Sequence, residues 1–252
     1  MKLGVIGFGE MGRSLVTGLM KQGVKKEEIA VCDKSERAQK KAVAMGLTIT
    51  DFDAISCECD AVLLTLPAKA FFETGKEWNK FGKKLIISCM AEVKMAELKK
   101  HFSGQIVRVI PTLAAENGIS IVGVCFDGQP ENKLAIKDMF TKVGAVIECN
   151  EEELAPLTSL AACGLSYAAY ILNCFINTAE NLGFDRGTGK DIVEKTFNAA
   201  IEQGNYEYVI GKIAGKDGIT IKGVNVMNEN NVHKSIDKAF KTAYSELLKS
   251  KE

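Results

Sequence analysis

The sequence predicts an α/β protein with an N-terminal Rossmann-type, doubly wound sheet and a C-terminal all-α domain. Three observations support this fold class. Short apolar runs alternate with helix-like stretches over residues 1–150, a glycine-rich loop follows the first run, and the remaining chain reads as helical. We therefore expect a dinucleotide-binding domain over residues 1–150 and an all-α substrate and dimerisation domain over residues 151–252.

The strands of the predicted sheet are apolar throughout, which is typical of strands that are buried on both faces. They are expected over residues 2–6, 29–33, 61–66, 84–89, 106–110, 119–126 and 145–149. Helices are expected over residues 10–21, 36–45, 70–80, 94–101 and 130–142. Because strands that alternate with helices form βαβ units, this order predicts a parallel sheet with helices on its faces.

The C-terminal domain is punctuated by Gly and Asn rather than by strands. Helices are expected over residues 154–179, 190–203, 205–213 and 231–249, with a loop over residues 214–223. The first of these contains no charged residue and is long enough to span a bilayer. It also contains Pro156 and two Asn, and it lacks a flanking basic cluster. We therefore favour a helix buried in a core or a subunit interface over a membrane span.

The composition narrows the class of protein. Hydrophobic residues make up 46% of the 252 residues and charged residues 25%, a profile typical of a soluble domain. The 32 basic residues balance the 32 acidic ones, which argues against a nucleic-acid partner. Eight cysteines form no C-x-x-C pair and there are two histidines, so no zinc site is expected. Glu10 and Arg13 interrupt any signal peptide, and a reducing, cytoplasmic location is expected.

The glycine-rich loop lies between the first predicted strand and the first predicted helix. In that context Gly7 permits a sharp turn, Gly9 lets the backbone approach a pyrophosphate, and Gly12 lets helix and strand pack closely. The free N–H groups at the helix start favour a phosphate there. The predicted cofactor contacts in this loop are Gly7, Phe8, Gly9, Glu10, Met11 and Gly12. The alternative is a tight turn that binds no ligand.

The end of the second predicted strand bears on the choice of cofactor. Asp33 lies 21 residues after Gly12, where a carboxylate can bind the ribose of NAD. Lys34, Ser35 and Arg37 follow, and cations with a hydroxyl suit the 2′-phosphate of NADP. We favour NADP over NAD and include Asp33, Lys34 and Ser35 among the cofactor-binding residues. Ser35 also reads as a helix N-cap.

Several motifs resemble those of the pyrroline-5-carboxylate reductase family. They are "GVIGFGEMGRSLVTGL", "AVLLTLPA", "LIISCMAEV", "VRVIPTLAAENGIS", "TSLAACGLSYAAYI" and "AGKDGITIKGV", in the order expected for that family. The resemblance covers essentially the whole chain. It implies NAD(P)H-dependent reduction of a cyclic imine, most directly 1-pyrroline-5-carboxylate to L-proline. It also implies interleaved helical domains in a homodimer, with the site between subunits.

The chain departs from the family motifs at positions close to the implied site. Leu66 replaces a lysine, Thr112 an asparagine and Cys163 a serine, while residues 215–217 replace Ser-Pro-Gly. An aspartate at position 217 would place a negative charge near the substrate carboxylate. This difference raises the hypothesis that the enzyme reduces a related imine.

The resemblance also implies site residues outside the glycine loop. Further cofactor contacts would come from Leu66, Pro67 and Met90. Substrate contacts would come from Cys163, Asp217, Gly218, Ile219 and Thr220. The resemblance makes Thr220 the catalytic residue, which hydrogen-bonds the ring nitrogen and helps to protonate it. The alternatives are an N-cap or turn role for Thr220 and a purely structural role for Cys163.

Two other classes of function remain open at this point. A β-hydroxyacid dehydrogenase has a similar domain order but needs a catalytic lysine on a helix, and "GLSYAAYILNCF" contains none. A non-catalytic homologue could keep the dinucleotide-binding fold, which would agree with the altered positions 66, 112 and 215–217. Enzymatic turnover of an imine separates these readings.

Overall fold

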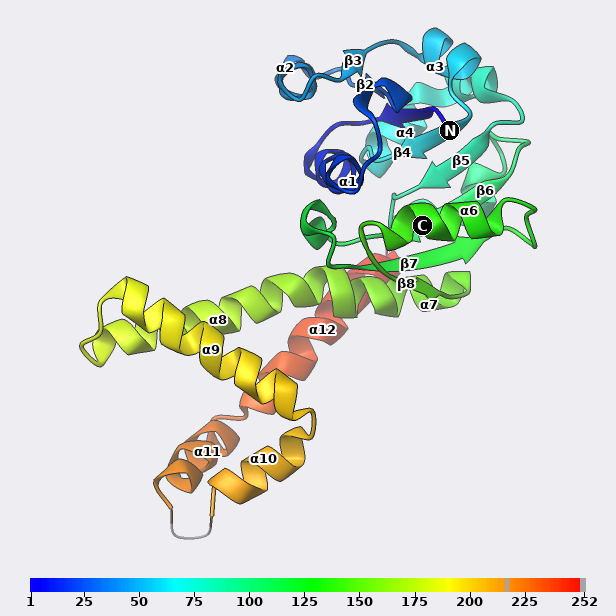
Figure 1. The fold of residues 1–252 in the computed structure, drawn as a ribbon. Helices are drawn as coiled ribbons and strands as arrows, with labels where there is room; N and C mark the ends of the chain where they lie inside the picture. The colour runs from blue at the N-terminus through cyan, green and yellow to red at the C-terminus, as the bar shows by residue number, and fades with distance from the viewer. Residues whose placement is uncertain (216–217, 250–252) are drawn as a thin grey trace. The chain divides into compact units, whose positions relative to one another are not determined.

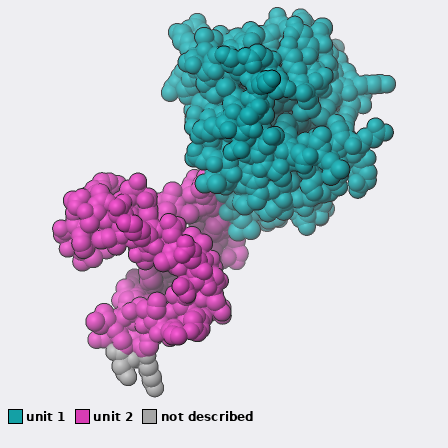
Figure 2. Space-filling model, viewed as in Figure 1, with its two compact units in different colours: residues 1–162, 244–252 teal, residues 163–243 magenta. Residues whose placement is uncertain are grey.

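A computed structural model describes residues 1–215 and 218–249 (Figure 1). Contacts divide the chain into two compact units, which Figure 2 shows in different colours. The first unit comprises residues 1–162 together with the C-terminal residues from Tyr244 onward, and the second comprises residues 163–243. The last strand ends at Glu148, and helices follow it.

The first unit contains a Rossmann-type sheet, which confirms the predicted fold class. Among the described residues the sheet has eight strands, in the order β3-β2-β1-β4-β5-β6-β7-β8. The strands are β1 (Leu3–Ile6), β2 (Ile29–Cys32), β3 (Thr48–Ile49), β4 (Ala61–Leu64), β5 (Leu85–Ser88), β6 (Ile106–Ile110), β7 (Ser120–Phe126) and β8 (Gly144–Glu148). Neighbouring strands pair parallel, except that β7 runs antiparallel to β6.

Helices cover the sheet on both faces, as the continuous apolar strands predict. They are α1 (Glu10–Lys21), α2 (Glu36–Ala44), α3 (Phe52–Glu58), α4 (Ala68–Thr74), α5 (Met95–Leu98), α6 (Lys133–Thr141) and α7 (Glu151–Leu157). Successive residues of one strand enter different cores: Leu63 belongs to one buried cluster, and Val62 and Leu64 belong to the other.

The helix predicted over residues 70–80 is wrong in its bounds. The α-helix α4 ends at Thr74, and a 3-10 helix follows over Gly75–Phe81. Gly75 has φ +56°, a region that favours glycine, and the chain leaves the α-helix at this residue. The 3-10 segment places Trp78 in the core, where its ring stacks on Phe71 and Phe52.

The second unit is all-α. Its helices are α8 (Gly164–Asn181), α9 (Arg186–Gln203), α10 (Tyr206–Ile213) and α11 (Ile219–Glu229), and α12 (Val232–Lys249) begins there. A π-helical stretch over Thr158–Cys163 leads into α8. Helix α9 begins four residues before its predicted start at residue 190, because Asp185 caps it by accepting the N–H groups of Gly187 and Thr188 at 3.0 and 3.1 Å.

The loop predicted over residues 214–223 is wrong from Ile219 onward. Helix α11 starts there, with Gly218 in extended conformation as its N-cap. The β-branched "ITI" reads poorly as helix, but Ile221 and Val224 are half-buried and lie three residues apart on one helix face. The low helix propensity of β-branched residues is the reason that the sequence predicts a loop here.

Most of the uncharged segment is not buried in the core of its own chain; the buried residues within 154–179 are Leu154, Thr158, Ser159 and Ala179. Within α8, which the structure describes completely, Ala179 is the one buried residue. Leu160 and Tyr170 are 64% and 72% exposed, respectively. The helix Glu151–Asn181 is long and apolar enough to pass a length-and-composition test for a membrane span, and 6% of its most apolar window is buried. An exposed apolar surface is typical of a face that contacts another protein or a membrane.

Candidate functional site

The candidate site lies where the strand order reverses, between β1 and β4. The glycine loop follows β1 and the segment from Thr65 to Pro67 follows β4, so both occupy the carboxyl edge of the sheet. In open α/β sheets this switch point is where ligands bind. A cavity of about 470 Å³ opens here, lined by Gly7, Gly9, Asp33, Phe52, Thr65 and Pro67 among others.

The structure gives a different geometric reason for glycine at each of the three positions of the motif. Gly7 has φ +92°, and a Cβ there would lie 2.9 Å from the Leu66 nitrogen. A Cβ on Gly12 would lie 2.6 Å from Thr65 Oγ1. At Gly9, by contrast, no atom of the described residues other than Gly9 and its two chain neighbours lies within 4 Å of the position of a Cβ.

The start of α1 fits a dinucleotide phosphate. Gly9 caps the helix with extended backbone and without a side-chain hydrogen bond, so the first N–H groups of α1 stay available. Glu10 forms ion pairs with two cations: Lys41 Nζ lies 3.0 Å and Arg13 Nη2 lies 3.1 Å from its carboxylate. These two contacts, Lys41 first, lower the pKa of Glu10. The open space above Gly9 and the unsatisfied helix start form a cradle of the kind that a pyrophosphate occupies.

Asp33 faces the glycine loop from the end of β2. Its Oδ2 accepts the Phe8 N–H at 2.5 Å, and its Oδ1 accepts the Ser35 N–H at 2.7 Å. Ser35 caps α2, because its hydroxyl accepts the Ala38 N–H at 3.5 Å. Asp33 therefore shapes the loop, whether or not it also contacts a ribose.

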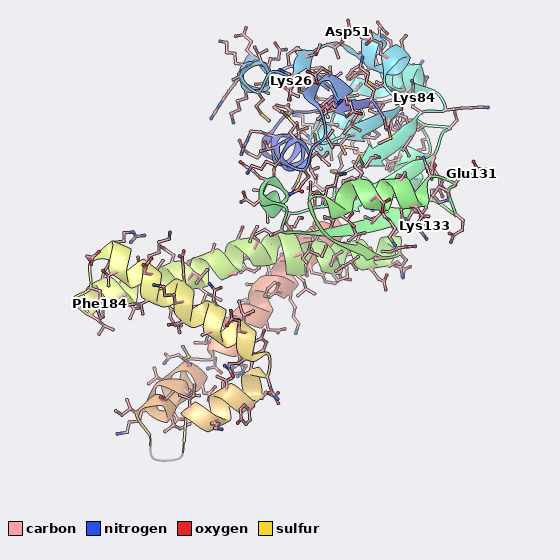
Figure 3. The ribbon with its side chains drawn as sticks, in the orientation of Figure 1. Lys26, Asp51, Lys84, Glu131, Lys133 and Phe184 are labelled. Atoms are coloured by element: carbon pink, nitrogen blue, oxygen red, sulfur yellow. The ribbon has the colours of Figure 1, made fainter. Side chains whose placement is uncertain are left out.

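The cavity is also lined by three residues that the sequence motifs do not single out, Cys32, Asp51 and Phe52. Phe52 stacks on Trp78 with ring centroids 5.3 Å apart. Asp51, labelled in Figure 3, caps α3 by accepting the Ala54 N–H at 2.9 Å. Cys32 lies at the end of β2, where burial raises the pKa of its thiol to about 11. Their position directly after strands or at a helix start was the only signal available in the sequence.

Met90 and Leu66 follow neighbouring strands at the same edge. Met90 is buried, and its carbonyl accepts from Arg108 Nη2 at 3.2 Å, while the Ala91 carbonyl accepts at 2.9 Å. Arg108 Nη1 also donates to Glu151 at 2.8 Å. The loop that carries Met90 is therefore held by a buried guanidinium.

The residues assigned to the substrate belong to the other part of the chain. Cys163 is half-buried and ends the π-helical stretch. Gly218 caps α11, and Ile219 and Thr220 are exposed in its first turn. Asp217 lies outside the described residues. Of the residues predicted to bind the cofactor, Gly7, Gly9, Asp33, Lys34, Leu66 and Pro67 line one cavity, whereas the Thr220 segment belongs to the second unit.

A metal centre is not among the features of the described residues. Within residues 1–215 and 218–249, no group of three or more His, Cys, Asp or Glu side chains is placed to hold a metal ion.

The Rossmann sheet, its glycine cradle and the helical C-terminal unit define an oxidoreductase that uses a nicotinamide dinucleotide. Comparison with known families agrees: residues 2–92 match the model described as "NADP oxidoreductase coenzyme F420-dependent", and residues 151–249 match "Pyrroline-5-carboxylate reductase dimerisation". The chain is similar to the pyrroline-5-carboxylate reductase family over most of its length.

Individual relatives and structures support the same family. A pyrroline-5-carboxylate reductase of Corynebacterium melassecola is 28% identical, covering 79% of this chain and 77% of its own length. The pyrroline-5-carboxylate reductase of Aquifex aeolicus is 24% identical, and the match covers 91% of this chain and 89% of that enzyme. The fold matches Plasmodium falciparum pyrroline carboxylate reductase with NADP bound, with a TM-score of 0.90, 20% identity and coverage of 100% and 98%. The fold also matches a 1-pyrroline-5-carboxylate reductase of Streptococcus pyogenes, with a TM-score of 0.89 and 19% identity. The match covers 98% of each chain.

Proposed function

We propose that this protein reduces 1-pyrroline-5-carboxylate to L-proline with NADPH. The observation that carries the proposal is the glycine cradle at the switch point of the sheet, joined in one chain to a region that matches the dimerisation domain of this reductase family. The relatives that share both parts along most of their length carry the name of this activity.

The chemistry places modest demands on the protein. Bound NADPH supplies a hydride to the electrophilic carbon of the C=N bond, and one proton completes the amine. In the proposal the glycine loop holds the pyrophosphate, and Pro67 and Met90 border the nicotinamide. The proton at the ring nitrogen is assigned to the hydroxyl of Thr220, which lies exposed in the first turn of α11. Free N–H groups at that helix start, after Gly218, suit the substrate carboxylate.

The preference for NADPH over NADH rests on charge at the end of β2. Both oxygens of Asp33 already accept backbone N–H groups, which reduces the repulsion of a 2′-phosphate. Lys34 borders the cavity, and Arg37 lies exposed on the first turn of α2. We expect Lys34→Ala and Arg37→Ala each to lower the NADPH-to-NADH ratio of kcat/KM by about tenfold, as loss of a charge-assisted phosphate contact predicts. An unchanged ratio in both variants would assign the preference elsewhere.

We further propose a homodimer in which the partner covers the apolar face of α8. The match to the dimerisation family model includes this helix. The exposed side chains of α8 include Leu165, Tyr170 and Phe175. The small-molecule imine is the proposed substrate, and the cytoplasmic location remains a prediction.

The proposal is tested with the purified full-length chain, 1-pyrroline-5-carboxylate and NADPH, with proline measured chromatographically. Thr220→Val removes the proposed proton donor and is expected to lower kcat by about 10²–10⁴, whereas Thr220→Ser restores most of it. Equal rates for the wild type and Thr220→Val contradict the catalytic role. Tight NADPH binding without turnover of this or any related imine instead supports the non-catalytic homologue.

A further inference from the structure

The peptide between Gly7 and Phe8 is held from both sides by side chains of other strands. Its N–H donates to Asp33 Oδ2 at 2.5 Å, from the end of β2. Its carbonyl, on Gly7, accepts a hydrogen bond from Thr65 Oγ1, from the end of β4. The turn that opens the glycine loop is thus fixed by β2 and β4, the two strands that flank β1.

Thr65 is placed for this contact by the sheet itself. It follows directly on β4, and its N–H donates to the Ile6 carbonyl at 2.9 Å, which extends the pairing with β1. Its side chain is half-buried and borders the cavity. A Cβ on Gly12 would lie 2.6 Å from Thr65 Oγ1, so the hydroxyl fills the space that this glycine leaves open.

Fixing the Gly7–Phe8 peptide affects ligand binding because the glycine beside it can adopt many backbone conformations. Gly7 has φ +92°, in the region that glycine tolerates, and a glycine has more backbone freedom than any other residue. Without side-chain contacts the turn would sample several orientations in the free protein. Ordering such a segment on binding costs affinity, and a segment that is ordered beforehand avoids that cost.

We propose that Thr65 is a positioning residue for the dinucleotide: its hydroxyl holds the Gly7–Phe8 peptide in the orientation that the phosphate requires. The inference rests on the proposed dinucleotide-dependent function and adds to it a residue that the glycine motif does not contain. Thr65 acts through the loop, so its effect belongs to cofactor binding rather than to the proton transfer assigned to Thr220.

The first test compares Thr65→Val, which keeps the shape and removes the hydroxyl, with Thr65→Ser, which keeps the hydroxyl. We expect the Kd for NADPH to rise about 3- to 10-fold in Thr65→Val, the effect of losing one neutral hydrogen bond, and to change less than about twofold in Thr65→Ser. The loss is expected in the KM for NADPH rather than in kcat. Thr141→Val is the matched control, because it removes a hydroxyl-to-carbonyl bond of 2.9 Å on the exposed helix α6.

The second test needs no ligand. Exchange of the Phe8 amide hydrogen is followed in the free protein, where loss of the Thr65 contact frees the peptide. We expect exchange about 3- to 10-fold faster in Thr65→Val than in the wild type or Thr65→Ser. Equal Phe8 exchange in all three proteins, or a Thr65→Ser variant as impaired as Thr65→Val, would overturn the inference. If Thr65→Val fails to fold, Thr65→Ala takes its place in both tests. A wild type that binds no dinucleotide contradicts the proposed function, while the exchange data still decide the role of Thr65 in the loop.

Discussion

At the residue scale, Gly9 and Gly12 serve one loop for opposite reasons. A Cβ on Gly9 would face open space, whereas a Cβ on Gly12 would lie against the Gly7 carbonyl oxygen and Thr65 Oγ1. The sequence motif assigns both to a dinucleotide, and the structure separates a glycine needed for ligand approach from a glycine needed for packing.

This difference predicts two distinct variants. Gly9→Ala is expected to leave Tm within about 2 °C of the wild type, since its methyl meets no atom of the described residues, and to weaken NADPH binding at least about tenfold. Gly12→Ala is expected to destabilise the fold by about 1–3 kcal/mol through overpacking. Calorimetry and NADPH titration measure both quantities. Equal Tm losses in the two variants would show that the glycines do not differ in this way.

Cys32 gives a pH-dependent prediction at the same cavity. Burial, followed by the charges of Asp33 and Asp51, raises the pKa of this thiol to about 11. A raised pKa keeps the thiol protonated, so its contribution to stability is full below about pH 9 and is lost as pH rises through about 11. We expect alkylation of Cys32 by iodoacetamide to be slow at pH 8, to accelerate toward pH 11, and to slow when NADPH is bound.

The exposed Cys57 serves as the accessibility reference for that measurement, with modification at each site followed by mass spectrometry. Fast alkylation of Cys32 at pH 8 that NADPH does not alter would contradict both the raised pKa and the placement of Cys32 beside the cofactor.

At the element scale, Arg108 joins β6 to the loop after β5 and to the start of α7. Its side chain is 4% exposed and bonds Glu151 and the carbonyls of Met90 and Ala91. Arg108→Leu leaves these acceptors without their cation and is expected to cost about 3–5 kcal/mol. Glu151→Gln is expected to lower the free energy of unfolding by about 1 kcal/mol. The Glu151 carboxylate is 34% exposed, and the glutamine amide that replaces it keeps an acceptor oxygen for Arg108.

Urea unfolding of the two variants measures these free energies. A cost for Arg108→Leu no larger than that for Glu151→Gln would mean that the buried guanidinium does not hold the three elements together.

The elements also show which parts of the fold could be predicted. Strands such as β4 are buried on both faces, so their apolar runs were clear in the sequence. Strand β3 has two residues, too few to show any period, and α3 starts at a cap, Asp51, that was not recognised. Helix α11 was missed because its β-branched start has weak helix propensity.

At the scale of the whole molecule, the two halves of the candidate site differ in how far the sequence could predict them. The glycine loop is a local motif, so its residues could be found from spacing alone. Thr65 and Phe52 contact the cavity only because of the strand order, which spacing does not encode. Thr220 lies in the second unit, and its proposed role does not follow from any local pattern.

The exposed apolar face of α8 carries the prediction about assembly. Tyr170 is 72% exposed. Burying a carboxylate at an apolar interface is costly, so Tyr170→Glu is expected to convert the dimer to a monomer at micromolar concentration. Lys69→Glu, on the exposed surface of α4, is the matched control and should remain dimeric. Light scattering measures both masses. A monomeric wild type would contradict the proposed interface.

The proposed reaction transfers a hydride from a nicotinamide to the imine carbon of 1-pyrroline-5-carboxylate. The reaction is tested most directly with NADPH deuterated at the transferable C4 position and mass spectrometry of the product. We expect L-proline that carries one deuterium at C5, formed in step with NADPH oxidation. NADPH that binds but yields no labelled proline from this substrate would contradict it.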